Sequence, residues 1–536
     1  MMYKNYLWWQ KNVIYQIYPR SFNDSDGDGI GDLQGIIKKL DYLNDLGIVG
    51  VWISPIYPSP MADFGYDVSD YTGIHEMFGD MKDFDELLKE IHKRDMKLIL
   101  DLVPNHSSDK HPWFIESKSS KNNPKRDWYI WKDPAPDGGP PNNWLSVFGG
   151  SGWEYDEATG QYYYHAFLKE QPDLNWRNPE VQNAMLNVMK FWLEKGVDGF
   201  RVDVMWHMIK DAKLRDDPPN PDHNEKLNSY SRHIPAYSTD QDEVHDIVRK
   251  MRKVVDSYKE RLLIGEIYLP ISKLVRYYGE DNKGAHLPFN FQLLQLPWEA
   301  SKIEAAINEY EGALPPEGWP NWVLGNHDKS RIATRVGKEQ AKVAAMLLLT
   351  LRGTPTVYYG DELGMEDVDI PEDKIQDPQA LNEPGVGQSR DPERTPMQWD
   401  DSENAGFTTG EPWLPLMKNF REVNVKKQWD EEGSMLHFHR RLLHLRNKEP
   451  ALHVGDHLPV YTENNLLSYM RSYNDKLFLI ILNLKNSEEN FTPGFFWKGE
   501  VKLSTHPEFE GKEMEGALRI KGDLGLLIEV IVNEYT

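Results

Sequence analysis

The stretch Asp198–Met208, DGFRVDVMWHM, combines the apolar pattern of a buried strand with a pair of opposite charges. Arg201 and Asp203 occupy one parity of the predicted strand. The other parity carries Phe200, Val202 and Val204. Because successive strand side chains point to opposite faces, the charged pair shares one face and the apolar residues share the other. An arginine two residues away on the same strand face favours the ionised form of a carboxylate. Asp203 is therefore a candidate for nucleophilic or electrostatic chemistry.

Other polar residues stand where predicted strands end. Glu266 follows RLLIG, His327 and Asp328 close NWVLGNHD, and His106 closes KLILDLVPNH. A single carboxylate in such a place is commonly a helix cap, but three at three strand ends are costly to bury unless they are paired or functional. The sequence has no cysteine, no phosphate-binding loop and no zinc-type histidine cluster. One carboxylate that attacks and one that donates a proton is the arrangement that cleaves glycosidic bonds.

The elements that must position these residues alternate between short apolar strands and amphipathic helices. Such alternation indicates parallel strands with right-handed crossovers, and around eight such units favour a (β/α)8 barrel. A doubly wound sheet is the competing fold, but the glycine-rich fingerprint that often follows its first strand is missing here. The predicted strands lie at residues 13–18, 49–54, 97–103, 197–204, 261–268, 321–328 and 354–362.

Two regions depart from this alternation. Residues 105–175 follow the third predicted strand and are rich in Pro, Gly, Asn and Trp, which indicates an inserted subdomain. From residue 451 short alternating strands predict a C-terminal antiparallel β-sandwich, with a hairpin turn at Asn474–Asp475. The predicted domains are therefore a barrel (1–104 and 176–450), the inserted subdomain (105–175) and a C-terminal β domain (451–536).

Composition limits the partners of the 536-residue chain. A net charge of −24 argues against nucleic acid and anionic membrane surfaces, and it fits a small neutral substrate. No run approaches the roughly 20 apolar residues of a membrane span, and Val343–Leu351 reads as a core helix. The absence of cysteine and of a secretory h-region predicts a cytoplasmic protein. A monomer and a homodimer both remain open.

A second candidate site is the loop DSDGDGIGD, Asp24–Asp32. Its carboxylates recur with the opening spacing of a calcium loop, and the twelfth position is Gly35 rather than the bidentate Glu of an EF-hand. Interleaved glycines let such a loop curl around an ion. We therefore expect a structural Ca²⁺, with Mg²⁺ as an alternative, while an acidic surface turn is the competing interpretation. The expected ligands are Asp24, Asp26, Asp28, Asp32 and the carbonyl of Ile30.

Six segments resemble, in order, those of glycoside hydrolase family 13, the α-amylase family, and most closely its oligosaccharide α-glucosidases. Four of them, DLVPNH, GFRVDV, GEIY and GNHD, resemble the signature segments of that family. QPDLNW resembles a fifth segment at the close of the inserted subdomain, and RTPMQW resembles a tract of the glucosidase members. The resemblance runs nearly from end to end, and relatives of this kind often bind calcium or magnesium at the acidic loop.

The resemblance implies a role for each matching residue. Asp203 would be the nucleophile, Glu266 the general acid and base, and Asp328 the group that grips sugar hydroxyls and stabilises the oxocarbenium-like state. A retaining mechanism of this kind expects the two reacting carboxyl groups about 5–5.5 Å apart. Arg394 would line the pocket entrance. The residues implied to bind substrate are Asp63, Tyr66, His106, Phe167, Arg201, His327 and Arg394.

The implied activity is that of a retaining, exo-acting α-glucosidase that releases glucose from the nonreducing end of short α-1,6- or α-1,4-linked gluco-oligosaccharides, with no organic cofactor. A transglucosylase, a sucrose isomerase or a trehalose-forming mutase on the same scaffold is the alternative. A non-enzymatic transporter heavy chain would require a membrane-spanning helix near the N-terminus, and no apolar run of this sequence is long enough for one. Val204 resembles the residue that accompanies α-1,6 cleavage, whereas the following MWHMIKD departs from the Asn-Phe of isomaltose-cleaving members.

Overall fold

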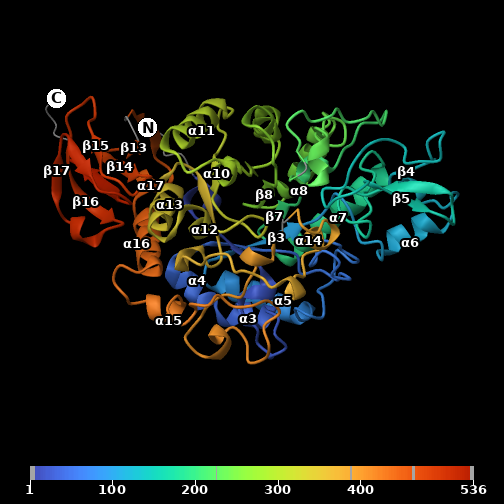
Figure 1. Ribbon diagram of the computed structural model, residues 1–536, viewed down its shortest axis with the longest axis horizontal. Coiled ribbons are helices and arrows are strands. Elements are labelled where there is room, and N and C mark those ends of the chain that lie inside the picture. The colour runs from blue at the N-terminus through green and yellow to red at the C-terminus, as the bar shows by residue number, and fades with distance from the viewer. Residues whose placement is uncertain (1–5, 225, 387–388, 462–464, 532–536) are drawn as a thin grey trace.

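The protein, in a computed structural model that describes residues 6–224, 226–386, 389–461 and 465–531, has three parts along its long axis (Figure 1). The barrel lies in the middle. The inserted subdomain, with β4, β5 and α6, lies at one end, and the C-terminal strands lie at the other. Among the described residues, no helix combines the length and apolar character that crossing a bilayer requires.

The barrel is a parallel sheet whose described strands follow the order β10-β11-β1-β2-β3-β7-β8-β9. Its two edge strands, β9 and β10, are joined by a side chain. Asn321 Oδ1 accepts the Asn290 N–H at 2.8 Å, and its Nδ2 donates to the Pro288 carbonyl. The amide thus links the two edges of the sheet and closes the (β/α)8 barrel. The strands are β1 (Ile14–Ile17), β2 (Gly50–Ile53), β3 (Lys97–Leu102), β7 (Gly199–Val202), β8 (Leu262–Gly265), β9 (Leu287–Pro288), β10 (Asn321–Val323) and β11 (Thr354–Tyr358).

Two details of the strands differ from the sequence prediction. Strand β9 was not predicted, because two residues ending in a proline carry neither an alternating pattern nor an apolar run. Strand β7 ends at Val202, and Val204 has a left-handed backbone with φ 34°. The parity assigned to Val204 was therefore wrong, since it lies beyond the strand rather than on its apolar face.

The helices around the barrel follow their apolar periodicity. Helix α5 shows the pattern: the Asp80 side chain accepts the backbone N–H groups of Lys82 and Asp83 and so caps the first turn. Its buried residues, Phe84, Leu87, Leu88 and Ile91, recur at three- and four-residue spacing and face the sheet. The principal outer helices are α3 (Leu33–Lys38), α4 (Leu40–Leu46), α5 (Met81–Lys93), α7 (Pro179–Lys195), α8 (Val244–Val255), α11 (Ala300–Ala313), α13 (Lys338–Thr350) and α16 (Met435–Lys448).

Helix α13 contains the apolar run Val343–Leu351 almost entirely, and nearly all of it is buried, as predicted. It lies beside the C-terminal domain (Figure 1). There β12 (Asp456–Val460), β13 (Leu466–Tyr473), β14 (Lys476–Asn483), β16 (Lys498–Ser504), β17 (Glu513–Glu515) and β19 (Gly525–Val530) form one antiparallel sheet, and β15 (Glu489–Phe491) pairs with β18 (Leu518–Ile520). The predicted hairpin is confirmed, because β13 pairs with β14 across Asn474, whose φ is 51°.

The inserted subdomain contains α6 (Pro112–Ser119) and a small sheet of β4 (Trp131–Lys132), β6 (Gln161–Tyr164) and β5 (Trp153–Asp156). Polar groups fasten it to the barrel. Lys210, which follows β7, is buried and forms an ion pair with Asp173, and its Nζ donates to Asn105 Oδ1 at 2.7 Å. Both partners lie at the ends of the inserted segment, so this contact holds its two connections against the loop after β7.

Candidate active site

A cavity of about 600 Å³ opens at the carboxyl ends of the barrel strands. Asp203, Glu266 and Asp328 follow β7, β8 and β10 and line it together. Five of the residues implied to bind substrate also line this cavity: Asp63, Tyr66, His106, Phe167 and His327. Arg201 and Arg394 are each only 1% exposed and lie behind the carboxylates. The expectation that Arg394 lines the entrance was therefore wrong.

Arg201 is the central cation of the site. Its Nη1 donates to Asp203 Oδ1 at 2.9 Å and to Asp101 Oδ1 at 2.9 Å, and its Nη2 lies 2.8 Å from Glu266 Oε2. One guanidinium thus contacts three buried carboxylates from β3 and the ends of β7 and β8. Its charge lowers the pKa of Asp203, the direction that the sequence predicted, but burial and the charge of Glu266 outweigh it and raise the pKa of Asp203 well above its usual value.

Asp203 and Glu266 share the Arg201 guanidinium, whose nitrogens lie 2.9 and 2.8 Å from their oxygens. Burial raises the pKa of both groups, and Glu266 further raises that of Asp203 by charge repulsion. Because two like charges that share one guanidinium resist joint ionisation, one of the two keeps a proton. One member can then act as nucleophile while the other donates the proton.

Asp328 has the opposite electrostatics. Burial opposes its ionisation, but the charges of Arg394 and Arg390 outweigh burial and hold the pKa of Asp328 far below its usual range. Arg394 Nη2 donates to Asp328 Oδ1 at 2.8 Å, and Arg390 Nη1 lies 3.5 Å from the same oxygen. A carboxylate that stays ionised at all working pH values suits a group that binds hydroxyls and stabilises positive charge.

His327 is a neutral imidazole with a defined tautomer. The Gln16 amide donates to Nδ1 at 2.7 Å, so Nε2 carries the hydrogen and donates to the Tyr66 hydroxyl at 2.8 Å. Tyr66 then donates to Asp101 Oδ2 at 3.0 Å. Burial lowers the pKa of His327 to about 3. The ring stacks on Tyr66 with centroids 5.5 Å apart and planes at 7°, which fixes a flat wall of the pocket.

Beside Asp328 the cavity wall contains the ion pair Asp63–Arg390, which the sequence did not predict. Arg390 Nη2 donates to Asp63 Oδ1 at 2.8 Å and to Asp377 Oδ1 at 2.7 Å. The Gln171 amide donates to Asp63 Oδ2 at 3.2 Å and also reaches His106 Nε2 at 3.1 Å. Arg390 precedes the recognised RTPMQW tract by four residues and belongs to no regular pattern, so no signal in the sequence marked it.

Val204 links the loop of Asp203 to Glu266. Its backbone N–H donates to Glu266 Oε2 at 2.8 Å, and its side chain lines the cavity. A β-branched residue with φ 34° carries backbone strain, because its side chain crowds the preceding carbonyl. The conformation aims the N–H at the acid, so the strain accompanies the positioning of Glu266.

In the acidic loop Asp24–Asp32, backbone N–H groups hold the carboxylates. Carboxylate oxygens of Asp24, Asp26 and Asp28 lie within 4.8 Å of one another. Asp24 also accepts the backbone N–H groups of Gly27 and Gly29 at 2.7 and 2.9 Å. Asp32 accepts the N–H groups of Ser25 and Gly35, so it caps α3 as well as facing the loop. The three gathered carboxylates form the oxygen-rich donor set that Ca²⁺ or Mg²⁺ prefers.

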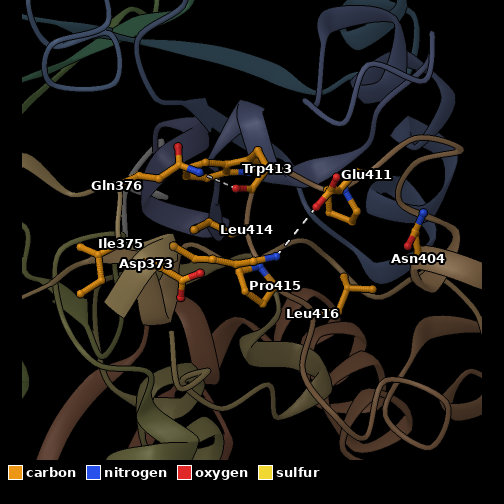
Figure 2. Close-up of a pocket in the computed structure, with 11 residues that line it drawn as sticks. Asp373, Ile375, Gln376, Asn404, Glu411, Trp413, Leu414, Pro415 and Leu416 are labelled. Carbon is orange, nitrogen blue, oxygen red and sulfur yellow. Dashed lines mark hydrogen bonds and ion pairs between the residues drawn. The ribbon is translucent and has the colours of Figure 1, made fainter. Parts of the chain in front are cut away.

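A second hollow, of about 400 Å³, lies between residues 373–376 and 411–416 (Figure 2). Gln376 donates to the Trp413 carbonyl at 2.6 Å, and Lys374 pairs with Glu411 across it at 3.8 Å. No group of three metal-binding carboxylates or histidines occurs there among the described residues. Trp413 instead packs behind the wall of the cavity, because its ring contacts Tyr18 with centroids 6.3 Å apart and Tyr18 stacks on His327 at 5.7 Å.

A parallel barrel with three carboxylates at the ends of β7, β8 and β10 defines a glycoside hydrolase of the α-amylase type. Residues 16–455 match the family model described as "Alpha amylase, catalytic domain", so the chain belongs to this family. It is therefore a glycoside hydrolase.

Individual relatives and solved structures resemble this chain over nearly its whole length. The oligo-1,6-glucosidase of Parageobacillus thermoglucosidasius is 41% identical, over 95% of this chain and 94% of that protein. The crystal structure of the alpha-glucosyl transfer enzyme XgtA superposes with a TM-score of 0.93 at 38% identity, over 98% and 100% of the two chains. The trehalulose synthase MutB from Pseudomonas mesoacidophila MX-45 superposes with a TM-score of 0.91 at 35% identity, over 98% and 100%. The likeness thus extends over the whole molecule.

Proposed function

We propose that the protein is a retaining, exo-acting α-glucosidase that removes glucose from the nonreducing end of short gluco-oligosaccharides. The observation that carries the proposal is the joint enclosure of the three carboxylates. The Asp63–Arg390 ion pair is buried beside Asp328, and the His327–Tyr66 stack forms the adjoining wall. A pocket that is closed on this side accepts the end of an oligosaccharide rather than its middle.

In the proposed reaction Asp203 attacks the anomeric carbon while Glu266 gives its proton to the departing glycosidic oxygen. The carbon–oxygen bond to the leaving sugar breaks, and a glucosyl ester forms on Asp203. Glu266, now ionised, takes a proton from water, whose oxygen attacks the same carbon and releases Asp203. Arg201 contacts both carboxylates throughout, and Asp328 stabilises the positive charge that develops on the ring.

For linkage we propose action on α-1,6 bonds and, with them, α-1,4 bonds. Support comes from the likeness to oligo-1,6-glucosidases and from Val204 in the cavity wall. The test is incubation with isomaltose, maltose and sucrose, followed by chromatography of the products. Release of glucose from isomaltose, with retention of the α configuration in the first product, is expected. Failure to cleave any α-glucoside would refute the function, and an inverted product would refute the mechanism.

A transferase is the second candidate, favoured by the superposition on the alpha-glucosyl transfer enzyme and on trehalulose synthase. The same glucosyl ester would then be opened by a sugar hydroxyl instead of water. The product analysis above separates the two. A transferase accumulates new oligosaccharides or a sucrose isomer, and it releases one glucose per isomaltose or maltose cleaved, whereas hydrolysis releases two.

We also propose that Asp24, Asp26 and Asp28, with Asp32 and the Ile30 carbonyl, hold a structural Ca²⁺ or Mg²⁺. The gathered carboxylates support this, and burial together with the charges of Asp26 and Asp24 raises the pKa of Asp28, a repulsion that a cation would relieve. A cytoplasmic location is proposed from the absence of cysteine. Elemental analysis of the purified protein tests the metal, and fractionation of the source cells tests the location.

A further inference from the structure

A hollow of about 610 Å³ lies where the barrel meets the C-terminal domain, and no described residue lines both this hollow and the catalytic cavity. Its walls come from α4, α16, the residue after α15 (Val425–Gln428) and β16, and Figure 1 shows these elements at the end of the barrel that faces the C-terminal strands. Its charged lining residues, as far as the structure describes them, are Arg440, Arg441, His444, Lys448, Lys502 and Asp45. Because the chain carries a net charge of −24, an anion that most of the surface repels is attracted to this basic hollow.

Helix α16 supplies most of this positive charge along one face. Arg440, His444 and Lys448 follow one another at four-residue intervals, so they lie on the same side of the helix over about 12 Å. Arg441 lies next to this row, and Lys502 on β16 adds a cation from the C-terminal domain. The basic hollow therefore brings cations of two domains together.

Two of these cations are held in place by contacts of their own. The Arg440 guanidinium lies over the Trp429 ring, 4.3 Å from its centroid. Arg441 donates from Nη1 and Nη2 to the two carboxylate oxygens of Glu510, at 3.1 and 2.6 Å. Side chains that are already ordered lose little conformational entropy when a ligand binds, which favours their use as ligand contacts.

Two cations of the basic hollow have no acid beside them. Arg441 and Lys502 pair with glutamates of the C-terminal domain, whereas Arg440 and Lys448 form no ion pair within the part of the chain that the structure describes. Arg440 is half-buried, and Lys448 is exposed. A half-buried cation loses part of its hydration without gaining a counterion, so an anionic ligand would restore the missing stabilisation.

The donors of the basic hollow match a phosphate ester better than a carboxylate. A phosphate ester carries up to two negative charges and three acceptor oxygens, which suits an arginine fork together with a lysine point charge. Leu445 and Leu503 also line the hollow and provide an apolar surface for the organic part of the ligand. The volume lies in the range of small-molecule sites, about 300–1,000 Å³, so a sugar ring fits beside the phosphate.

We propose that the basic hollow binds a small phosphorylated sugar, whose phosphate contacts Arg440 and Lys448, and that the bound ligand links the barrel to the C-terminal domain. Because α16 belongs to the barrel and Lys502 to the C-terminal domain, a ligand that contacts both stabilises the folded chain by mass action. The site is separate from the three catalytic carboxylates, so the proposal does not depend on the glucosidase function.

The test is isothermal titration calorimetry of the full chain with glucose 6-phosphate, fructose 1,6-bisphosphate, inorganic phosphate, sulfate and glucose. Arg440→Gln/Lys448→Gln removes the two unpaired charges. Arg421→Gln/Lys418→Gln is the matched control, since it removes the same charge from exposed side chains outside the hollow, and Arg421 also lies over an aromatic ring, that of Phe420, at 4.6 Å. For the sugar phosphates we expect Kd to rise about tenfold or more in the first variant, the loss expected for two charge-assisted contacts, and to stay nearly unchanged in the control.

In the wild type a sugar phosphate should bind more tightly than phosphate, sulfate or glucose, and it should raise Tm. Equal binding of all the anions would overturn the proposal, because the hollow would then be a nonselective anion surface. Sugar phosphate binding that is absent, or that is unchanged in Arg440→Gln/Lys448→Gln, would overturn it as well, since the second result would place the ligand elsewhere, for example in the catalytic cavity. Circular dichroism shows whether each variant is folded. If the double variant is not folded, Kd for Lys448→Gln decides, because this exposed side chain can be replaced without disturbing the Trp429 contact.

Discussion

The catalytic cavity and the Asp24–Asp32 loop are both clusters of carboxylates, yet the protein holds them in different ways. Around the cavity the acids are buried, except for the partly exposed Asp328, and they pair with arginines: Arg201 contacts three of them, and Arg390 contacts another three. In the loop Asp26 and Asp28 are exposed or nearly so, and backbone N–H groups supply the hydrogen bonds. Burial amplifies electrostatic interactions, so the opposite pKa shifts of Asp203 and Asp328 in the cavity are larger than those of Asp28 and Asp24 in the loop.

The largest expected effect comes from removing the nucleophile. Asp203→Ala should lower kcat by about four orders of magnitude or more, because no other group can form the glucosyl ester. Added azide should partly restore turnover and yield a β-glucosyl azide. The measurement is steady-state hydrolysis of isomaltose with and without azide, with product anomers read by NMR. An Asp203→Ala enzyme that keeps most of its activity would contradict the assigned nucleophile.

Removing the proton donor should separate substrates by leaving group. Glu266→Gln should cost isomaltose hydrolysis about 10²–10⁴-fold, the usual worth of general acid catalysis, and cost α-glucosyl fluoride far less. Equal losses on both substrates would exclude the acid role.

The same substitution should change the pH profile. Burial raises the pKa of Glu266, so the acid keeps its proton to higher pH and kcat/KM falls as pH rises through that raised pKa. This alkaline limb should vanish in Glu266→Gln, because the amide does not titrate. Rates of the variant and the wild type on isomaltose across the pH range provide the comparison, and persistence of the limb in the variant would assign it to another group.

A smaller effect is expected at Val204, which lies at the edge of the cavity next to both reacting groups. Val204→Thr should shift the ratio of kcat/KM for isomaltose to kcat/KM for maltose toward maltose. The shift should correspond to about 1–3 kcal/mol or less of transition-state free energy. Val147→Thr makes the same chemical change at another position of the cavity lining and serves as the control. If the ratio does not move, Val204 does not select the linkage.

The smallest effect on catalysis is expected from the loop. Chelation or Asp26→Asn should lower Tm while leaving initial rates at mild temperature nearly unchanged, because a bound ion stabilises the folded state by mass action. Asp137→Asn, an exposed acid of the inserted subdomain, is the control. If chelator does not change Tm and elemental analysis finds no metal, the loop is an acidic turn rather than a metal site.

Much of the architecture could be predicted because it depends on local patterns. The strand and helix alternation predicted the barrel, and the two-residue turn at Asn474–Asp475 predicted the hairpin. Strand β9 escaped prediction because Leu287–Pro288 is too short to show a pattern, and it is fixed by neighbours such as Asn321. The parity of Val204 failed for a related reason, since β7 ends two residues earlier and the contact with Glu266 decides its conformation.

The sequence by itself determined which residues could react: Asp203, Glu266 and Asp328 stand at strand ends, and parallel strands bring such ends to one face of a barrel. Only the tertiary structure decided how those acids differ. Burial raises the pKa values of Asp203 and Glu266, which both contact Arg201, whereas Asp328 is held ionised by Arg394 and by Arg390, which no motif marked. The physical reason is that a pKa depends on burial and on charges within a few ångströms, and these neighbours come from segments far apart in the chain.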